Sequence, residues 1–217
     1  MNESFDLEGP AGRLEAILMN PPTVPVAAAV VCHAHPRHGG MMHFKVVFRA
    51  AKALQSAGAA VLRFNFRGVG RSEGRFDNGR GEQDDARAAL DEMERRFPGR
   101  PLVLGGFSFG SVVALQVGRQ DPRVRALLVL GYPASFLEES VPLEGPKPRL
   151  FVQGEQDRFG SGDVVRALVE PLSGPRSLVV VPGTDHFFEG KLDELQGAVC
   201  TWAEQRPWAA GESGGRA

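Results

Sequence analysis

Short apolar runs alternate with longer, more polar stretches along most of this chain. The short runs predict β-strands over residues 13–19, 27–33, 59–66, 101–107, 124–132, 149–154 and 177–183. The longer stretches predict helices over residues 44–57, 82–97, 111–118, 161–170 and 192–202. Strands that alternate with helices are typical of a mostly parallel sheet covered on both faces. The sequence therefore predicts an α/β fold, with functional sites at the carboxyl ends of the strands.

Glycine and proline mark the ends of two of these elements. The run over 13–19 alternates between polar and apolar residues and is followed by Pro21 and Pro22, which predicts an edge strand. Gly58 ends the helix predicted over 44–57, because glycine readily takes the left-handed conformation found at helix C-termini.

Length and charge limit the organisation and the partners of the chain. Its 217 residues suit one domain with a full hydrophobic core. We expect that domain over residues 1–210, and we expect the polar, glycine-rich residues 211–217 to form a disordered tail. The formal net charge is −1 and basic residues are mixed with acidic ones, which speaks against nucleic acid and membranes as partners.

Cysteine usage and the N-terminal segment point to a compartment. Cys32 and Cys200 are the only cysteines, and their spacing fits neither a C-x-x-C pair nor a zinc site. Two free thiols are typical of a reducing compartment. The acidic N-terminal segment lacks the apolar core of a secretory signal, and no apolar run is long enough to span a bilayer. We therefore expect a cytoplasmic protein.

The pentapeptide GFSFG at 106–110 is the strongest chemical signal in the sequence. It follows the strand predicted over 101–107 and precedes the helix predicted over 111–118. This is the setting in which a G-x-S-x-G motif presents a serine nucleophile. An ordinary glycine-rich turn between a strand and a helix is the alternative, and the context favours the nucleophile.

The geometry of such a turn suits Ser108 to nucleophilic attack. Gly106 and Gly110 let the strand and the helix pass closely without clashes between β-carbons, and the strained turn exposes the serine oxygen. Because a helix begins here, the backbone amide of Phe109 and the positive end of the helix dipole lie where an oxyanion would form. Ser108 is our candidate nucleophile and Phe109 our first oxyanion donor.

His186 is the candidate general base, since a serine hydroxyl needs a base and imidazole is the usual one. It follows the last predicted strand and is the only histidine in the C-terminal half of the chain. The acid that orients it should lie between serine and histidine in chain order. Asp157 and Glu155 both fit that order. We favour Asp157, because two more residues of loop let it reach the histidine.

His33, His35, His38 and His43 lie close together and raise the alternative of a zinc site. No Asp or Glu lies among them, and their spacing does not match the helical H-E-x-x-H pair. We therefore expect no metal and no other cofactor, and we interpret the segment as a loop that acts through its backbone.

Together these motifs resemble the α/β-hydrolase superfamily. The resemblance rests on CHAHPRHGG (32–40), NFRGVGRSEG (65–74), GFSFG (106–110), GEQD (154–157) and GTDHFF (183–188). Within the superfamily the chain is similar to small hydrolases without a cap, a group related to dienelactone hydrolases and simple carboxylesterases. The resemblance implies a three-layer α/β/α sandwich with a mostly parallel sheet of about eight strands.

The resemblance also implies the second oxyanion donor, the backbone amide of His35 beside that of Phe109. Pro36 has no amide to offer, and Arg37 is the fallback. The group typically reads H-P-H-P where this chain has His33-Ala34-His35-Pro36, a mild departure that leaves the path of the loop intact.

Arg67 is a further residue with two interpretations. It could bind a substrate carboxylate through both guanidinium nitrogens. An arginine in a glycine-rich loop more often ties backbone carbonyls together, and we favour that structural role.

The predicted function is a serine hydrolase that cleaves small carboxylic esters through an acyl-enzyme, with Ser108, His186 and Asp157 as its triad. Ser108 replaces the cysteine nucleophile of dienelactone hydrolases, which implies ordinary ester chemistry. Segment 133–148 is too short for the lid that many members insert, so we expect no lid domain and an open site that suits short acyl groups. The expected partner is a small-molecule ester, and a homodimer is compatible with the sequence. Thioesters, lactones, a metal-dependent hydrolase and a non-catalytic ligand-binding protein remain alternatives.

Overall fold

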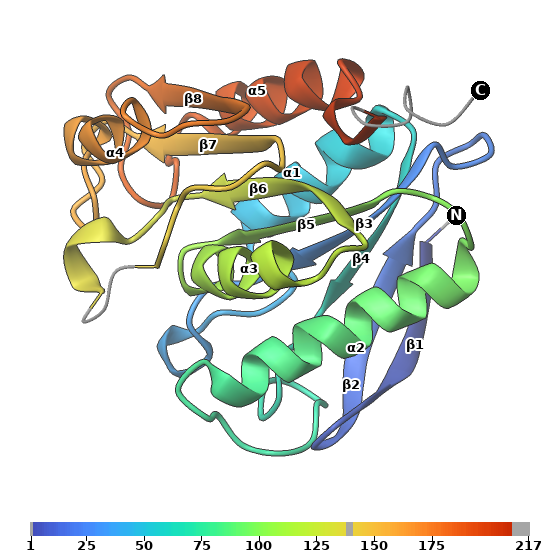
Figure 1. Cartoon of the computed structure of the whole chain (residues 1–217). Coiled ribbons are helices and arrows are strands. Elements are labelled where there is room, and N and C mark those ends of the chain that lie inside the picture. Colours follow the sequence, from blue (N-terminus) through green and yellow to red (C-terminus); the bar gives the residue numbers. More distant parts are fainter. Residues whose placement is uncertain (1, 138–140, 210–217) are drawn as a thin grey trace.

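An eight-stranded sheet forms the centre of the molecule, in the order β1-β2-β4-β3-β5-β6-β7-β8 (Figure 1). The structure is a computed structural model and describes residues 2–137 and 141–209. Its strands are β1 (Asn2–Gly9), β2 (Gly12–Met19), β3 (Ala27–Cys32), β4 (Ala59–Phe64), β5 (Leu102–Phe107), β6 (Val124–Leu130), β7 (Arg149–Gly154) and β8 (Arg176–Val181). β1 pairs with β2 and β2 with β4 in antiparallel fashion, and the other pairs are parallel.

Helices cover both faces of the sheet and complete three layers (Figure 1). They are α1 (Lys45–Ser56), α2 (Arg80–Arg96), α3 (Phe109–Gln120), α4 (Gly162–Val169) and α5 (Leu192–Glu204). Buried side chains of α1 and α5 share one core cluster with the sheet, and those of α2, α3 and α4 share the other. The strands β3, β4, β5 and β7 are buried at every position, as expected for parallel strands covered on both sides. The predicted three-layer α/β fold is confirmed.

The expectation of an edge strand over 13–19 is wrong. β2 lies between β1 and β4, and β1 forms the edge. The apolar pattern does not predict β1, because most of its residues are polar and exposed and only Leu7 is buried. β1 forms its backbone hydrogen bonds in a hairpin with β2, a pairing that the sequence pattern of β1 does not predict.

The carboxyl ends of the parallel strands lie at one edge of the sheet, and several strands end earlier there than predicted. β3 ends at Cys32, β4 at Phe64 and β6 at Leu130. The residues that follow, including His33 and Asn65, therefore enter the loops of this edge. These loops and the first residue of α3, Phe109, carry the predicted site residues.

The segment between β6 and β7 is short, and its described part forms a 3-10 turn (Ala134–Phe136) with extended chain around it. The described residues thus contain no lid domain over the carboxyl edge. The predicted tail over 211–217 lies outside the residues that the structure describes. Among those it does describe, no helix combines the length and the apolarity that crossing a bilayer requires.

Candidate active site

Ser108 lies at the sharp turn between β5 and α3. Its backbone has φ 55° and ψ −121°, a conformation that residues other than glycine seldom adopt and that costs on the order of 1–3 kcal/mol. A β-carbon at Gly106 would collide with the carbonyl of Gly110, and one at Gly110 would collide with the carbonyls of Cys32 and His33. The two glycines therefore permit the close crossing of strand and helix that holds the turn.

A continuous chain of hydrogen bonds joins the three predicted residues. The hydroxyl of Ser108 donates to Nε2 of His186 over 2.9 Å, with the imidazole in the tautomer that carries its proton on Nδ1. That Nδ1–H donates to Oδ2 of Asp157 over 2.7 Å. The side chains come from the loops after β5, β7 and β8, which the parallel sheet brings to one edge. His186 is 4% exposed and Asp157 2%, so little water competes for these hydrogen bonds.

Asp157 is held by two further donors. The backbone amide of Phe159 donates to Oδ1 over 2.8 Å, and Nε2 of Gln153 donates to Oδ2 over 2.7 Å. Gln153 is buried on β7, donates also to the carbonyl of Gly160 and accepts from the amide of Tyr132. Gln153 belongs to none of the sequence motifs, although a polar residue near the end of the buried strand RLFVQG is a signal that it has a polar partner.

Glu155, the alternative acid, does not reach the histidine. Its carboxylate is exposed and accepts a hydrogen bond from the amide of Gly183 over 2.8 Å. Asp185, next to His186 in sequence, turns away and accepts hydrogen bonds from the amides of Phe187 and Glu189. Glu155 and Asp185 therefore shape the histidine loop, and only Asp157 contacts the imidazole.

The two residues whose amides are predicted to hold the oxyanion, His35 and Phe109, lie beside the serine. The rings of His35 and Phe109 are 5.1 Å apart, and both residues line the same cavity as Ser108. Within the described part of the chain, neither of their backbone amides donates a hydrogen bond to another residue. The amide of Arg37, the fallback donor, is already used, because it donates to Nδ1 of His35 over 3.2 Å. The geometry thus leaves the His35 amide free for a ligand and occupies that of Arg37.

Buried polar groups fix the loop that carries His35. His33 donates from Nδ1 to the carbonyl of Ala34 over 2.6 Å and accepts at Nε2 from the amide of Phe66 over 3.0 Å. Burial lowers the pKa of His33 to about 4, so the ring is neutral near pH 7 and keeps both hydrogen bonds. Farther along the loop, the amide of Met42 donates to Oδ1 of Asn65 over 2.8 Å.

The histidines of the sequence cluster do not converge on one point. His33 uses both ring nitrogens in protein hydrogen bonds, His35 stacks on His38 at 4.4 Å, and His43 lines a different cavity. Burial and the neighbouring charges of His38 and Arg37 lower the pKa of His35. Among the residues the structure describes, no group of His, Cys, Asp and Glu side chains is arranged to hold a metal ion.

Arg67 has a structural role, but its partner differs from the expectation. Its guanidinium and its backbone amide bind the buried carboxylate of Asp85 on α2, with distances of 2.8–3.1 Å. We expected backbone carbonyls as partners. The ion pair ties the glycine-rich loop after β4 to α2 and leaves Arg67 engaged away from a substrate.

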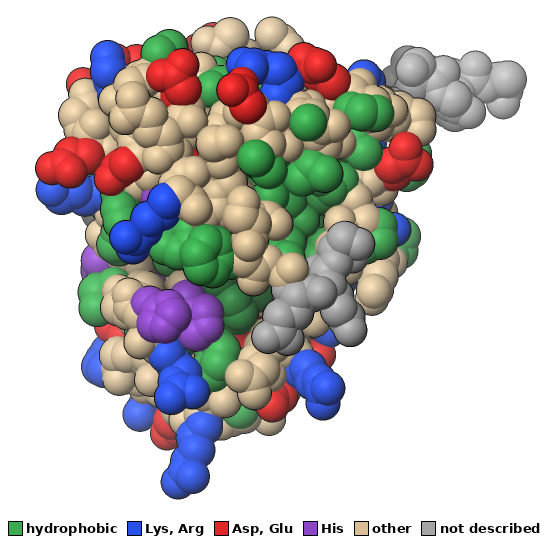
Figure 2. Space-filling view, turned by 90° about the vertical axis from the view of Figure 1, so that its left-hand side faces the viewer, with side chains coloured by type: hydrophobic (Ala, Val, Ile, Leu, Met, Phe, Trp, Pro, Cys, Tyr) green, Lys and Arg blue, Asp and Glu red, His purple; other side chains and the backbone are tan. Residues whose placement is uncertain are grey.

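A cavity of about 540 Å³ opens at Ser108, and we call it the serine cavity. Its lining joins polar or basic side chains to a larger apolar part, and includes His35, His38, Arg80, Gln83, Phe109, Val112, Gln116, Phe136, Leu137 and Phe159. Figure 2 shows this edge of the molecule, where histidine and hydrophobic side chains gather around a hollow. The cavity gives a bound molecule direct access to the serine hydroxyl.

The comparisons with known proteins assign the chain to a family. The family model described as serine aminopeptidase, S33, matches residues 26–147. The chain belongs to the α/β-hydrolase superfamily. An uncharacterized protein of Rickettsia prowazekii is 38% identical to it over 201 residues, which cover 88% of this chain and 84% of that protein.

Two solved α/β-hydrolases share the fold over almost their whole length. A serine hydrolase homologue from Coxiella burnetii is 39% identical with a TM-score of 0.85, covering 92% of this chain and 96% of that one. A serine hydrolase without a lid from Xanthomonas campestris is 37% identical with a TM-score of 0.85, covering 94% of both chains. The predicted α/β-hydrolase fold without a lid domain is thereby confirmed for the described part of this chain.

Proposed function

We propose that this α/β-hydrolase is a serine carboxylesterase in which Ser108 is the nucleophile, His186 the general base and Asp157 the orienting acid. The observation that carries the proposal is the chain of hydrogen bonds from Ser108 through His186 to Asp157, at 2.9 Å and 2.7 Å. A hydroxyl bonded to a buried imidazole, itself oriented by a carboxylate, is the arrangement that activates a serine.

In the first half of the reaction, the oxygen of Ser108 attacks the ester carbonyl carbon while its proton passes to Nε2 of His186. The carboxylate of Asp157 stabilises the imidazolium that results. The carbonyl electron pair moves onto its oxygen, where the backbone amides of Phe109 and His35 donate to it. When the carbonyl reforms, the bond to the alcohol oxygen breaks, and that oxygen keeps the bonding pair and takes the proton from His186.

In the second half, water attacks the carbonyl carbon of the acyl-serine. His186 accepts a proton from that water, and the same two amides hold the second oxyanion. The bond between the acyl carbon and the oxygen of Ser108 then breaks, and the proton returns from His186 to the serine. The carboxylic acid leaves and the enzyme is restored.

The lining of the serine cavity supports esters over peptides with a free N-terminus, although the matching family model is described by aminopeptidases. His38 and Arg80 line the cavity, and a substrate's α-ammonium group beside Arg80 would meet a like charge. An uncharged ester meets no such repulsion. Thioesters and lactones react by the same carbonyl chemistry and can be tested as substrates in the same way.

The test is hydrolysis of p-nitrophenyl esters from acetate to octanoate, with alanine p-nitroanilide as the peptide analogue. We expect Ser108→Ala to lower kcat by about 10⁴-fold or more, with no effect of a chelator on the wild type. Ser135→Ala is the matched control, because Ser135 is an exposed serine at the same edge. Turnover that survives Ser108→Ala, or that the chelator abolishes, would overturn the proposal.

A further inference from the structure

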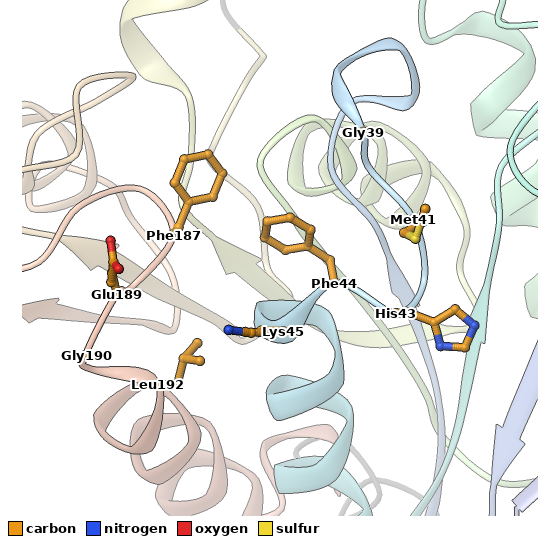
Figure 3. A pocket seen from close by; sticks show the side chains of 9 residues that line it. All are labelled: Gly39, Met41, His43, Phe44, Lys45, Phe187, Glu189, Gly190 and Leu192. Atoms are coloured by element: carbon orange, nitrogen blue, oxygen red, sulfur yellow. The ribbon is translucent and has the colours of Figure 1, made fainter.

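A second cavity, of about 470 Å³, lies between the loop after β3 and the loop that follows His186 (Figure 3). Its lining includes Met41, Phe44, Lys45, Phe187 and Leu192. We propose that this alcohol cavity receives the alcohol half of the ester and that the serine cavity receives the acyl half. The inference rests on the proposed esterase function and names its substrate class, which is esters with a bulky apolar alcohol.

The ring of His186 lies next to one wall residue of each cavity. One neighbour of its ring is Phe159, at 4.5 Å, which lines the serine cavity. Another is Phe187, at 5.3 Å, which lines the alcohol cavity. A group that receives a proton from Nε2 of His186 is therefore close to a wall of both cavities.

The loop after β3 is also shared. His35 and His38 line the serine cavity, whereas Gly39 and Met41 line the alcohol cavity. An ester held with its carbonyl oxygen at the amide of His35 thus has one cavity toward each end of this loop. The two halves of the substrate diverge from the reacting carbon into different spaces.

The order of the reaction steps indicates which half of the ester enters which cavity. The acyl group stays bonded to the oxygen of Ser108 until water releases it, and Ser108 lines the serine cavity and not the alcohol cavity. The alcohol oxygen is protonated by His186 when its bond to the acyl carbon breaks, and it must then leave. The alcohol cavity, whose wall residue Phe187 lies next to the imidazole, provides space for that group.

The walls of the alcohol cavity favour an apolar ring or branched group. The ring of Phe44 lies 5.8 Å from that of Phe187, and Figure 3 shows both side chains beside the space that Leu192 borders from the start of α5. Met41 and Phe187 are 42% and 43% exposed, so an apolar ligand here would bury surface that water now contacts. Lys45 and Glu189 add polar groups to the lining.

The test measures kcat/KM for two ester series. One keeps acetate and varies the alcohol from ethyl to cyclohexylmethyl and benzyl, and the other keeps ethanol and varies the acyl group from acetate to hexanoate. We expect the wild type to prefer benzyl over ethyl acetate by about tenfold or more. Leu192→Trp should reduce that preference at least tenfold and leave the acyl preference within twofold. Lys45→Trp, at an exposed site, should act in the same direction if the first variant folds poorly.

Gln116→Trp is the matched variant in the serine cavity, since Gln116 lines that cavity from α3. It should change the acyl preference and leave the alcohol preference within twofold. A change in acyl preference in Leu192→Trp, or no change in alcohol preference in either alcohol-cavity variant, overturns the assignment of cavities. If the wild type hydrolyses none of these esters through Ser108, the proposed function fails instead, so the two failures are distinguishable.

Discussion

The side-chain amide of Gln153 donates a 2.7 Å hydrogen bond to Oδ2 of Asp157, the same oxygen that accepts from His186. Two donors thus share one carboxylate oxygen in a buried site. Each draws electron density from it, and so Gln153 limits how strongly the carboxylate can stabilise a protonated His186. This geometry assigns Gln153 a positioning role that acts through Asp157.

We therefore expect Gln153→Met to move the acidic limb of the kcat/KM pH profile to higher pH, because Asp157 then supports the imidazolium more strongly. The expected fall in kcat is about 10–100-fold with little change in KM, because Asp157 also loses one of the hydrogen bonds that hold it in place. Gln156→Met is the matched control, since Gln156 is exposed in the same loop. An unchanged pH profile in Gln153→Met would show that the residue only supports the fold.

The choice between the two acids of the loop gives a second prediction. Asp157→Asn should lower kcat by about 10³–10⁴-fold, because the amide no longer holds the imidazole with its proton on Nδ1. Glu155→Gln should lower it less than about threefold, because the carboxylate of Glu155 accepts its hydrogen bond from the amide of Gly183 and not from the imidazole. Equal losses in the two variants, measured with p-nitrophenyl acetate, would contradict the assignment.

His33 makes the stability depend on pH. Its pKa is lowered by burial from 6.5 to about 4. Between pH 4 and 6.5, His33 is therefore protonated in the unfolded chain and neutral in the folded protein. Its contribution to the free energy of unfolding is present above about pH 6.5 and falls by about 3 kcal/mol as the pH is lowered to 4. Urea unfolding at pH 7 and pH 4 measures this loss.

In His33→Gln, whose side chain does not titrate, the loss of unfolding free energy between pH 7 and pH 4 should be smaller than in the wild type by most of the contribution of His33. His38→Gln is the control, because His38 is exposed, and it should keep the wild-type dependence. If His33→Gln and the wild type lose the same stability between the two pH values, the buried histidine is not the group responsible.

The pair formed by Arg67 and Asp85 gives a prediction on stability. Asp85 is fully buried and binds the guanidinium and the backbone amide of Arg67. Asp85→Asn should lower the free energy of unfolding by about 3–5 kcal/mol, because it leaves a buried charge without its partner. Asp163→Asn, which breaks an exposed pair with Arg166, should cost about 0.5 kcal/mol or less. A small effect at Asp85 would contradict the structural role assigned to the pair.

The sequence predicts those features of the site that depend on residues close together in the chain. The strained turn at Ser108 needs glycines at fixed offsets, and the carboxyl ends of parallel strands meet at one edge, so motif and chain order indicate Ser108 and His186 and leave Asp157 and Glu155 as the candidate acids. The same logic favours Asp157 over Glu155 through loop length. Their distances, by contrast, follow from the packing of loops that are far apart in sequence.

Other features depend on contacts that no local pattern encodes. β1 gains its hydrogen bonds from a hairpin with β2, not from an apolar run of its own. The partner of Arg67, Asp85, lies on a helix. The role of Gln153 can be recognised only from its hydrogen bond to Asp157 in the folded structure. The division of the edge into two cavities likewise arises from the loops after six strands, β3 to β8.

Covalent capture of the nucleophile tests the central proposal most directly. The protein is treated with a fluorophosphonate that reacts only with activated serines, and the modified residue is located by mass spectrometry of its peptides. We predict one label, on Ser108, that Ser108→Ala abolishes and His186→Ala slows strongly, while Ser135→Ala is labelled like the wild type. Labelling of another residue, or labelling of Ser108 at an equal rate in His186→Ala, would contradict the account.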